Sequence, residues 1–182
     1  MTSSDEHADN NQFSITPQQA NELADLAGTL CADAGHCLEQ NHWIAALIQI
    51  SGSAEAALLA TVCVFEPELR EQGLWQPPRG DPTRWMLGQL AEVARKAGWL
   101  PVDLSKTPGE IFTNLDGKIG DALRFVEHIR NMAVHPGAYV RETVRPALED
   151  KQHMQLTYKL IDGIIAVVFE HLTTQINTLE NS

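Results

Sequence analysis

The chain has 182 residues, of which 43% are hydrophobic and 20% are charged, a composition typical of one globular domain. A formal net charge of −11 argues against broad, sequence-blind nucleic-acid binding, which needs a basic surface. Any nucleic-acid role must therefore rest on a local site or be offset by a partner. No apolar run approaches the roughly 18 to 20 residues of a membrane span, so no membrane association is expected.

The N-terminal segment "MTSSDEHADNNQ" is polar and acidic, unlike a signal or transit peptide. We expect residues 1–15 to form a disordered tail and residues 16–180 to form a single helical domain. Three cysteines, Cys31, Cys37 and Cys63, lie in apolar-rich stretches. An odd number of cysteines without a leader fits a reducing cytosol better than a disulfide framework, so a cytoplasmic location is expected.

The first helix is predicted from "TPQQ", where Thr16 can cap, Pro17 suits the first helical position and Gln19 completes a capping box. This helix should run to about residue 40. A second helix is expected over about residues 42–65, where it stops before Pro67.

A loop rich in proline and glycine is predicted at residues 66–82, and it is either a lid or a simple connector. Asp81 and Pro82 should cap a third helix, "TRWMLGQLAEVARKAG", which Gly98 ends. Further helices are expected at about residues 115–134 and 147–179. Because no segment alternates with period two, the predicted fold class is all-α: an irregular up-and-down bundle of about five helices.

On each of two expected helices, residues spaced three and four positions apart form a mostly apolar stripe that should face inward, and one charged residue interrupts it. A bare buried carboxylate or guanidinium is costly, so we predict that Arg130 contacts Glu55. The alternative is that each side chain reaches solvent at the edge of its stripe. The small residues of "SGSA", at positions 51–54, fit the close approach of a neighbouring helix. The stripes are Ile44, Ile48, Ser51, Glu55, Leu58, Val62 and Phe65, and Ile119, Leu123, Val126, Arg130 and Ala133.

The stretch "HIRNMAVHPG" combines a cation, an amide and an imidazole in Arg130, Asn131 and His135. On a regular helix Arg130 and His135 would lie about 140° apart. Pro136 pushes the preceding residue out of the helical region, so His135 is expected at a frayed end, free to swing toward Arg130. These groups suit phosphoryl transfer without a metal, since histidine can move a proton and arginine can stabilise phosphate charge. A simple capped helix end is the alternative.

The segment "RNMAVH" resembles the Arg-x(4–6)-His signature, with Asn directly after Arg, of HEPN-domain proteins. Two further segments, "IAALIQISGSAEAALLATV" and "MLGQLAEVARKAGWL", resemble the early helix and a later helix and turn of that family. The resemblance covers about residues 42–140. The sequence departs from one toxin subgroup, which has tyrosine two residues after the histidine, because Gly137 occupies that position and Tyr139 follows.

The resemblance implies a small all-α fold and metal-independent RNA cleavage that leaves a 2′,3′-cyclic phosphate and needs no cofactor. Arg130 and His135 would be the catalytic pair, Asn131 would orient His135 or the phosphate, and Glu55 would hold Arg130. A homodimer through the motif region is implied as well. Further candidates for RNA binding, which a solvated helix face explains equally well, are Arg124, Arg141 and Arg145.

Other patterns favour structure over chemistry. Zinc binding by Cys31, His36 and Cys37 is disfavoured, because their spacing lacks the usual short pairs of zinc sites. The four tryptophans are expected at core edges or an interface rather than as base-stacking platforms. The last helix, with "LIDGIIAVVFEHL", should be either the central bundle helix or a dimer surface.

Two functions remain open. The first is a metal-independent endoribonuclease of HEPN type, acting as a toxin or a host-defence component with an antitoxin or defence-system partner. The second is a non-catalytic helical interaction module that retains the same scaffold.

Overall fold

The computed structural model describes residues 14–100, 126, 129–130 and 150–180. Within these residues there is no strand, and the predicted all-α fold class is confirmed. Apart from residues 14 and 15, the predicted N-terminal tail lies outside this description, as does most of the helix expected at residues 115–134. The helices are α1 (Pro17–Glu39), α2 (Trp43–Val64), α3 (Glu66–Glu71), α4 (Leu87–Lys96) and α7 (Lys151–Glu180), with 3-10 turns η1 (Pro78–Gly80) and η2 (Pro82–Arg84).

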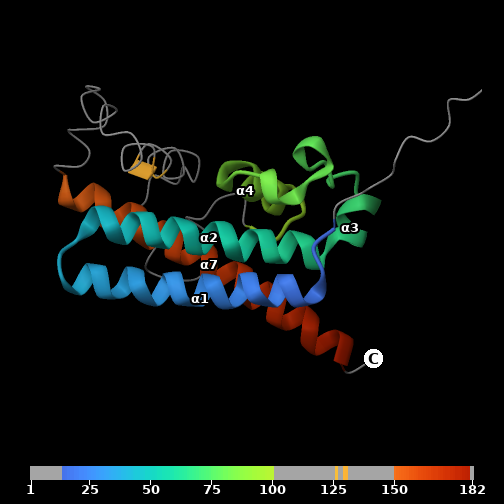
Figure 1. Cartoon of the computed structure of the whole chain (residues 1–182), viewed down its shortest axis with the longest axis horizontal. Coiled ribbons are helices and arrows are strands. Elements are labelled where there is room, and N and C mark those ends of the chain that lie inside the picture. Colours follow the sequence, from blue (N-terminus) through green and yellow to red (C-terminus); the bar gives the residue numbers. More distant parts are fainter. Residues whose placement is uncertain (1–13, 101–125, 127–128, 131–149, 181–182) are drawn as a thin grey trace, which may run out of the picture.

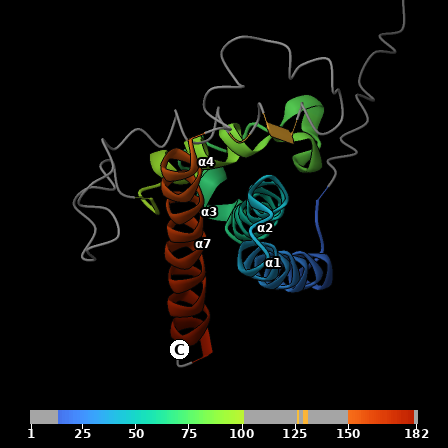
Figure 2. The same ribbon diagram turned by 90° about the vertical axis from the view of Figure 1, so that its left-hand side faces the viewer.

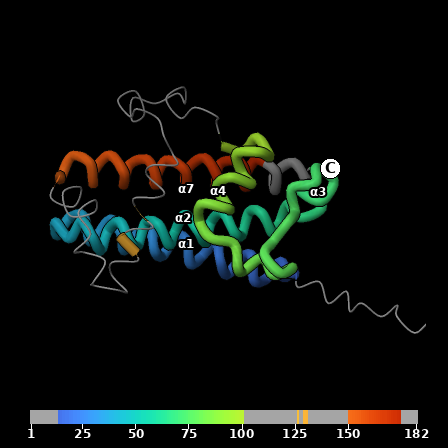
Figure 3. Tube along the Cα trace, turned by 90° about the horizontal axis from the view of Figure 1, so that it is seen from above, coloured from blue at the N-terminus to red at the C-terminus, as the bar shows by residue number. Residues whose placement is uncertain are grey.

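Helix α2 is the centre of the described bundle (Figure 1). It lies between α1, which runs antiparallel to it, and α7 (Figure 3). Helix α7 crosses α2 at an incline (Figures 1 and 2). Helices α3 and α4 contact α2 as well. Most residues of α2 are therefore buried, from Ala46 to Val62. The last helix was a candidate for the central position, and the structure gives that position to α2 instead.

The apolar composition of α2 also qualifies it, by length and hydropathy alone, as the single candidate membrane span among the described helices. Its most apolar window has a mean hydropathy of 1.6, so the expectation that no apolar run approaches such a length is wrong here. Within the bundle, 72% of that window is buried. Cover by α1, α4 and α7 accounts for the apolar character of this helix.

The start of α1 is formed by the predicted capping box. The backbone N–H of Gln19 donates to the Thr16 hydroxyl at 3.2 Å, and the Thr16 backbone N–H donates to the Gln19 side chain at 2.9 Å. Pro17 follows in the first turn. Two of the donors that a helix start leaves open are thus satisfied by side chains, which fixes where α1 begins.

The α1–α2 pair packs closely through small residues. The Ser53 hydroxyl donates to the backbone carbonyl of Ala27 across the helix pair at 2.7 Å. A Cβ added to Gly52 would lie 3.2 Å from Leu30 Cδ1, which is tight contact. Along α1, buried alanines recur every seven residues at Ala20, Ala27 and Ala34. The close approach predicted from "SGSA" is confirmed.

The segment predicted as a loop at residues 66–82 contains the short helix α3 and the turn η1, so that prediction is wrong in part. Pro67 occupies the first turn of α3, where proline lacks a donor that the helix does not need. Glu66 and Glu68 place carboxylates at the same helix start, which favours helix there. Pro67, from which the end of α2 was predicted, therefore also marks the start of α3.

The single third helix predicted from residue 83 is also wrong, because Trp85 and Met86 are extended and separate η2 from α4. Trp85 is only 5% exposed and packs edge-on against Trp75, with ring centroids 5.2 Å apart. Burial of this large ring outweighs the helical tendency of the segment. Asp81, which was predicted to cap the third helix, caps the turn η2 instead and accepts from the Thr83 N–H at 3.0 Å.

Gly98 ends α4 as predicted. Its φ of +79° lies in the left-handed region that favours glycine. Its N–H donates to the Arg95 carbonyl at 3.1 Å, and the Trp99 N–H donates to the Ala94 carbonyl at 2.9 Å. This is the paired hydrogen-bond pattern of a glycine-terminated helix.

The last helix begins at Lys151 rather than near residue 147. Asp150 precedes it, and its carboxylate accepts from the backbone N–H of His153 at 3.1 Å. An aspartate at the cap position satisfies a free donor of the first turn. Three tryptophans, Trp75, Trp85 and Trp99, are buried, as expected for side chains at core edges.

Candidate functional site

The carboxylate side of the candidate site comes from the middle of α2. Glu55 is preceded by Ala54 and followed one turn later by Leu58, and both of these residues are 0% exposed. The Glu55 side chain keeps 29% of its surface exposed. The buried neighbours hold the backbone of α2 in place, so the carboxylate projects from a rigid element.

The cationic side comes from Arg130, on a helical segment that also holds Val126 and Ile129. Both apolar residues are 0% exposed, whereas the Arg130 side chain is 40% exposed. The predicted stripe omitted Ile129, which is buried, and this places Arg130 at the edge of the inward face. The segment lies over the same side of α2 as α4 (Figures 1 and 2).

Arg130 and Glu55 form an ion pair in which the guanidinium Nη1 donates to the carboxylate Oε2. The predicted contact between two residues 75 positions apart is therefore confirmed. Both side chains remain partly exposed, so the pair lies at the edge of the predicted inward faces. One nitrogen of the guanidinium is held by Glu55 and the exposed part of the group can meet a ligand. This geometry suits the holding of a phosphate or another anion.

Because the pair is partly exposed, we expect Glu55→Ala to lower the free energy of unfolding by less than about 1 kcal/mol. Water screens the attraction and solvates the guanidinium that the substitution leaves behind. Urea denaturation of the two proteins measures the difference. A loss of about 3 kcal/mol or more, as for a broken buried pair, would contradict this expectation.

The remaining predicted site residues lie outside the residues that the structure describes. They are Asn131 and His135, the two proposed partners of Arg130, and the candidate RNA-binding residues Arg124, Arg141 and Arg145. Their roles stay predictions. Two of the predicted site residues, Arg130 and Glu55, are thus brought together by the described structure.

Two cysteines are poorly suited to nucleophilic chemistry. Burial raises the pKa of the Cys63 thiol to about 12, with a further contribution from the Glu66 carboxylate. Burial also raises the pKa of the Cys31 thiol, to which Asp162 contributes. The thiolate is the reactive form, so both residues are thiols near neutral pH.

The disfavoured zinc site finds no geometric support in α1. Cys31 and Cys37 are partly buried and His36 is exposed, all on one helix. Six residues of helix turn through about 600°, which directs the two thiols to different sides. Among the described residues, no group of three or more His, Cys, Asp or Glu side chains could hold a metal ion.

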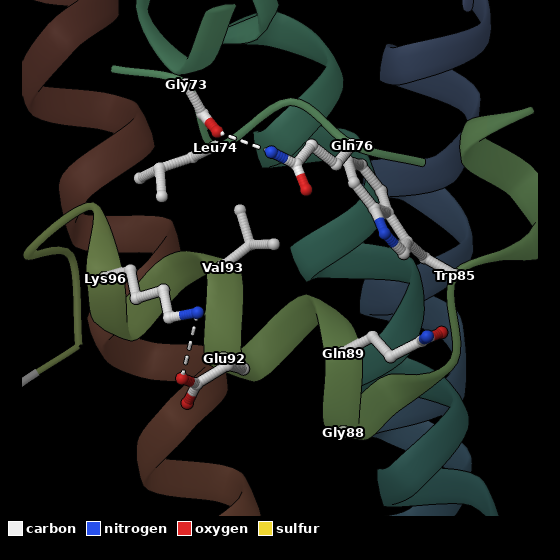
Figure 4. A pocket seen from close by; sticks show the side chains of 9 residues that line it. All are labelled: Gly73, Leu74, Gln76, Trp85, Gly88, Gln89, Glu92, Val93 and Lys96. Carbon is white, nitrogen blue, oxygen red and sulfur yellow. Dashed lines mark hydrogen bonds and ion pairs between the residues drawn. The ribbon is translucent and has the colours of Figure 1, made fainter. Parts of the chain in front are cut away.

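A hollow next to α4 was not predicted from the sequence. It lies between α4 and the loop after α3 and includes Gln76, Trp85 and Lys96 in its lining (Figure 4). These residues share no sequence motif, and the extended residues Trp85 and Met86 separate η2 from α4 beside the hollow. The extended break could not be predicted, because residues 83–98 as a whole have a helical sequence pattern.

Comparisons with models of known protein families, with curated proteins and with solved structures find no match to this chain.

Proposed function

We propose that this protein is a metal-independent endoribonuclease whose cleavage site includes Arg130, His135 and Asn131. The observation that carries the proposal is the Arg130–Glu55 ion pair, which fixes a partly exposed guanidinium at the start of "RNMAVH". The resemblance of that segment, and of the α2 sequence, to HEPN-domain proteins supports the same function. It supports in addition a homodimer and a role as a toxin or host-defence component with an antitoxin or defence-system partner.

In the proposed reaction the 2′-hydroxyl of a ribose attacks the adjacent phosphorus, and the bond from phosphorus to the 5′-oxygen of the next nucleotide breaks. The products are a 2′,3′-cyclic phosphate and a 5′-hydroxyl. His135 takes the proton from the 2′-hydroxyl or gives one to the leaving oxygen. Arg130 stabilises the charge that builds on the phosphate oxygens, and Asn131 orients His135 or the phosphate. Glu55 acts through Arg130 as a positioning residue.

The experiment is incubation of the purified chain with structured and tRNA-like RNA, with and without EDTA. Cleavage is expected in both conditions, and His135→Ala is expected to lower its rate by at least about 100-fold, the range for loss of a general acid or base. Gel analysis and end-group mapping of the products measure both. His153→Ala is a matched control on α7, where His153 is exposed, and should cleave like the unaltered chain. Cleavage that EDTA abolishes, or that survives in His135→Ala, would contradict the proposal.

A second candidate, a non-catalytic helical interaction module, is favoured by the net charge of −11. An acidic surface repels RNA phosphates and suits a basic protein partner. In that function the Arg130–Glu55 pair would only hold the fourth predicted helix against α2. Absence of RNA cleavage under all conditions, with a folded protein, would favour this candidate.

A further inference from the structure

Helix α1 lies at the edge of the described bundle, with α2 beside it (Figures 1 and 2). Its three buried alanines face α2, and the hydrogen bond from Ser53 to Ala27 joins the two helices. Among the described elements, α2 is the main contact of α1. Every other residue of α1 is exposed or partly exposed, so this helix has room for a further partner.

A second row of α1 side chains is apolar and partly exposed. It consists of Leu23, Leu26, Leu30 and Cys37, with Asp33 between the last two. Leu26 is 47% exposed, and the other apolar members are partly exposed. The steps of three and four residues along this row are those of a coiled-coil seam, where each side chain packs between side chains of a facing helix. The row, which we call the leucine seam, therefore has the spacing that receives a helix.

The leucine seam is directed away from α7. Burial and then the Asp162 carboxylate of α7 raise the pKa of the Cys31 thiol, so Cys31 marks the side of α1 that is nearest α7. Leu26 lies about 140° from Cys31 around the helix, because five residues turn through about 500°. Leu30 borders α2, since a Cβ added to Gly52 would lie 3.2 Å from Leu30 Cδ1. The seam thus runs along the side of the α1–α2 pair that faces away from α7.

The charges of α1 indicate what kind of helix fits the seam. Its formally charged side chains are all exposed carboxylates, and it has no lysine or arginine; they are Glu22, Asp25, Asp33 and Glu39. In the part of the chain that the structure describes, no lysine or arginine forms an ion pair with any of them. A helix packed on the seam would cover Asp33, and a covered carboxylate is costly without a cation opposite it. The facing helix must therefore carry a lysine or arginine at that level.

The same charges disfavour other occupants of the seam. A second copy of the chain would bring an identical set of carboxylates to the contact. The N-terminal segment of the chain carries Asp5, Glu6 and Asp9 without a lysine or arginine, and RNA carries phosphates. Like charges brought together weaken binding, whereas a cationic helix is attracted by the net charge of −11.

We propose that the leucine seam of α1 is a docking site for a basic amphipathic helix of another protein. Apolar side chains of that helix pack between Leu23, Leu26 and Leu30, and one lysine or arginine pairs with Asp33. The surface goes beyond the proposed cleavage reaction, because neither Glu55 nor Arg130 belongs to α1.

Fluorescence anisotropy of a labelled synthetic helix, titrated with the full chain, tests the proposal. The lysine probe has leucines at the a and d positions of about three heptads, one lysine at a central d position and further lysines on its outer side. It is kept at nanomolar concentration so that it does not self-associate. A Kd of about 1 to 50 µM is expected.

Two further probes separate the seam from charge alone. A glutamate probe has glutamate in place of every lysine, and a scrambled probe has the same composition as the lysine probe without a leucine stripe. Both are expected to bind at least about tenfold more weakly than the lysine probe. No binding of the lysine probe at about 200 µM chain would overturn the proposal, as would equal binding of either other probe.

A charge exchange at Asp33 tests the predicted pairing. Asp33→Lys is expected to weaken binding of the lysine probe at least about tenfold and to strengthen binding of the glutamate probe by a similar factor. Glu39→Lys is the matched control, because Glu39 is exposed and lies about 180° from Leu30 around α1. At about 0.15 M salt it should change neither affinity by more than about twofold. Equal effects of the two substitutions would overturn the proposal, since net charge would then explain the binding.

Leu26→Gln tests the apolar part of the seam and is expected to weaken the lysine probe about tenfold. Met86→Gln, at a side chain that is 61% exposed and outside α1, should have little effect. An equal loss in Met86→Gln would contradict a specific seam. Sedimentation velocity should show the same oligomeric state with and without Leu26→Gln. If the substitution turned a dimer into a monomer, the seam would join two copies and the proposal would be overturned. RNA cleavage by Leu26→Gln should be unchanged, so failure of the cleavage proposal and failure of this one are told apart.

Discussion

Arg130→Ala is expected to slow metal-independent RNA cleavage by about 100- to 1,000-fold while the protein stays folded. The guanidinium is the cation that Glu55 fixes beside the predicted reacting phosphate, and alanine removes its charge and its donors together. Because the side chain is 40% exposed, its loss should lower the free energy of unfolding by less than about 1 kcal/mol. Initial cleavage rates and urea denaturation measure the two effects.

Arg84→Ala is the matched control for this substitution. Arg84 also forms an ion pair with a nearby carboxylate, at 3.1 Å from Asp81, and its side chain is 53% exposed. Its removal should change the cleavage rate little. If Arg84→Ala slowed cleavage as much as Arg130→Ala, the effect would come from the general loss of positive charge and not from the candidate site.

A double-substitution cycle shows whether Glu55 acts through Arg130. Glu55→Gln keeps one acceptor oxygen and removes the charge, so its cleavage rate should lie between those of the unaltered chain and Arg130→Ala. In the Arg130→Ala background the Glu55 substitution should have no further effect, because it has no guanidinium left to position. If the two substitutions together slowed cleavage by the product of their separate factors, Glu55 would have a role in the reaction that does not depend on Arg130.

Local signals in the sequence located most helix ends of the described fold. Thr16 and Gln19 fix the start of α1, and Gly98 fixes the end of α4. These ends are predictable because the backbone polar groups left open at a helix end are satisfied by residues close by in the sequence. The break at Trp85 was not predictable in this way. The break is caused by the contact of Trp85 with Trp75, ten positions away in the chain. Hydrophobic periodicity does not predict which ring a tryptophan will contact.

The candidate site was likewise predictable only in part. The stripe spacings placed Glu55 and Arg130 on inward faces, and a buried charge demands a partner, so their contact could be predicted. Their partial exposure could not be predicted, because periodicity gives the direction of a side chain but does not show which other elements pack over it. Ile129 shows the difference: it lies beside the predicted stripe and is buried, which moves Arg130 to the edge of the face.

The positions of the candidate site and of the leucine seam depend on α2, because Glu55 projects from it and α1 packs on it. Leu58 lies one turn after Glu55 and is 0% exposed. We expect Leu58→Ala to lower the free energy of unfolding by about 2 to 5 kcal/mol, since the cavity would be enclosed by the elements around α2 and could not collapse fully. For a chain of this size each kcal/mol corresponds to about 2 to 4 °C in Tm.

Leu26→Ala makes the same chemical change on α1 at a side chain that is 47% exposed, so it controls for the removal of a leucine as such. It should cost less than about 0.5 kcal/mol, because the alanine leaves no enclosed cavity and water already reaches the site. Urea denaturation and calorimetric melting of both variants give the comparison. Similar losses in the two variants would mean that α2 is not the buried centre of the bundle, and the rigid support argued for Glu55 would be lost with it.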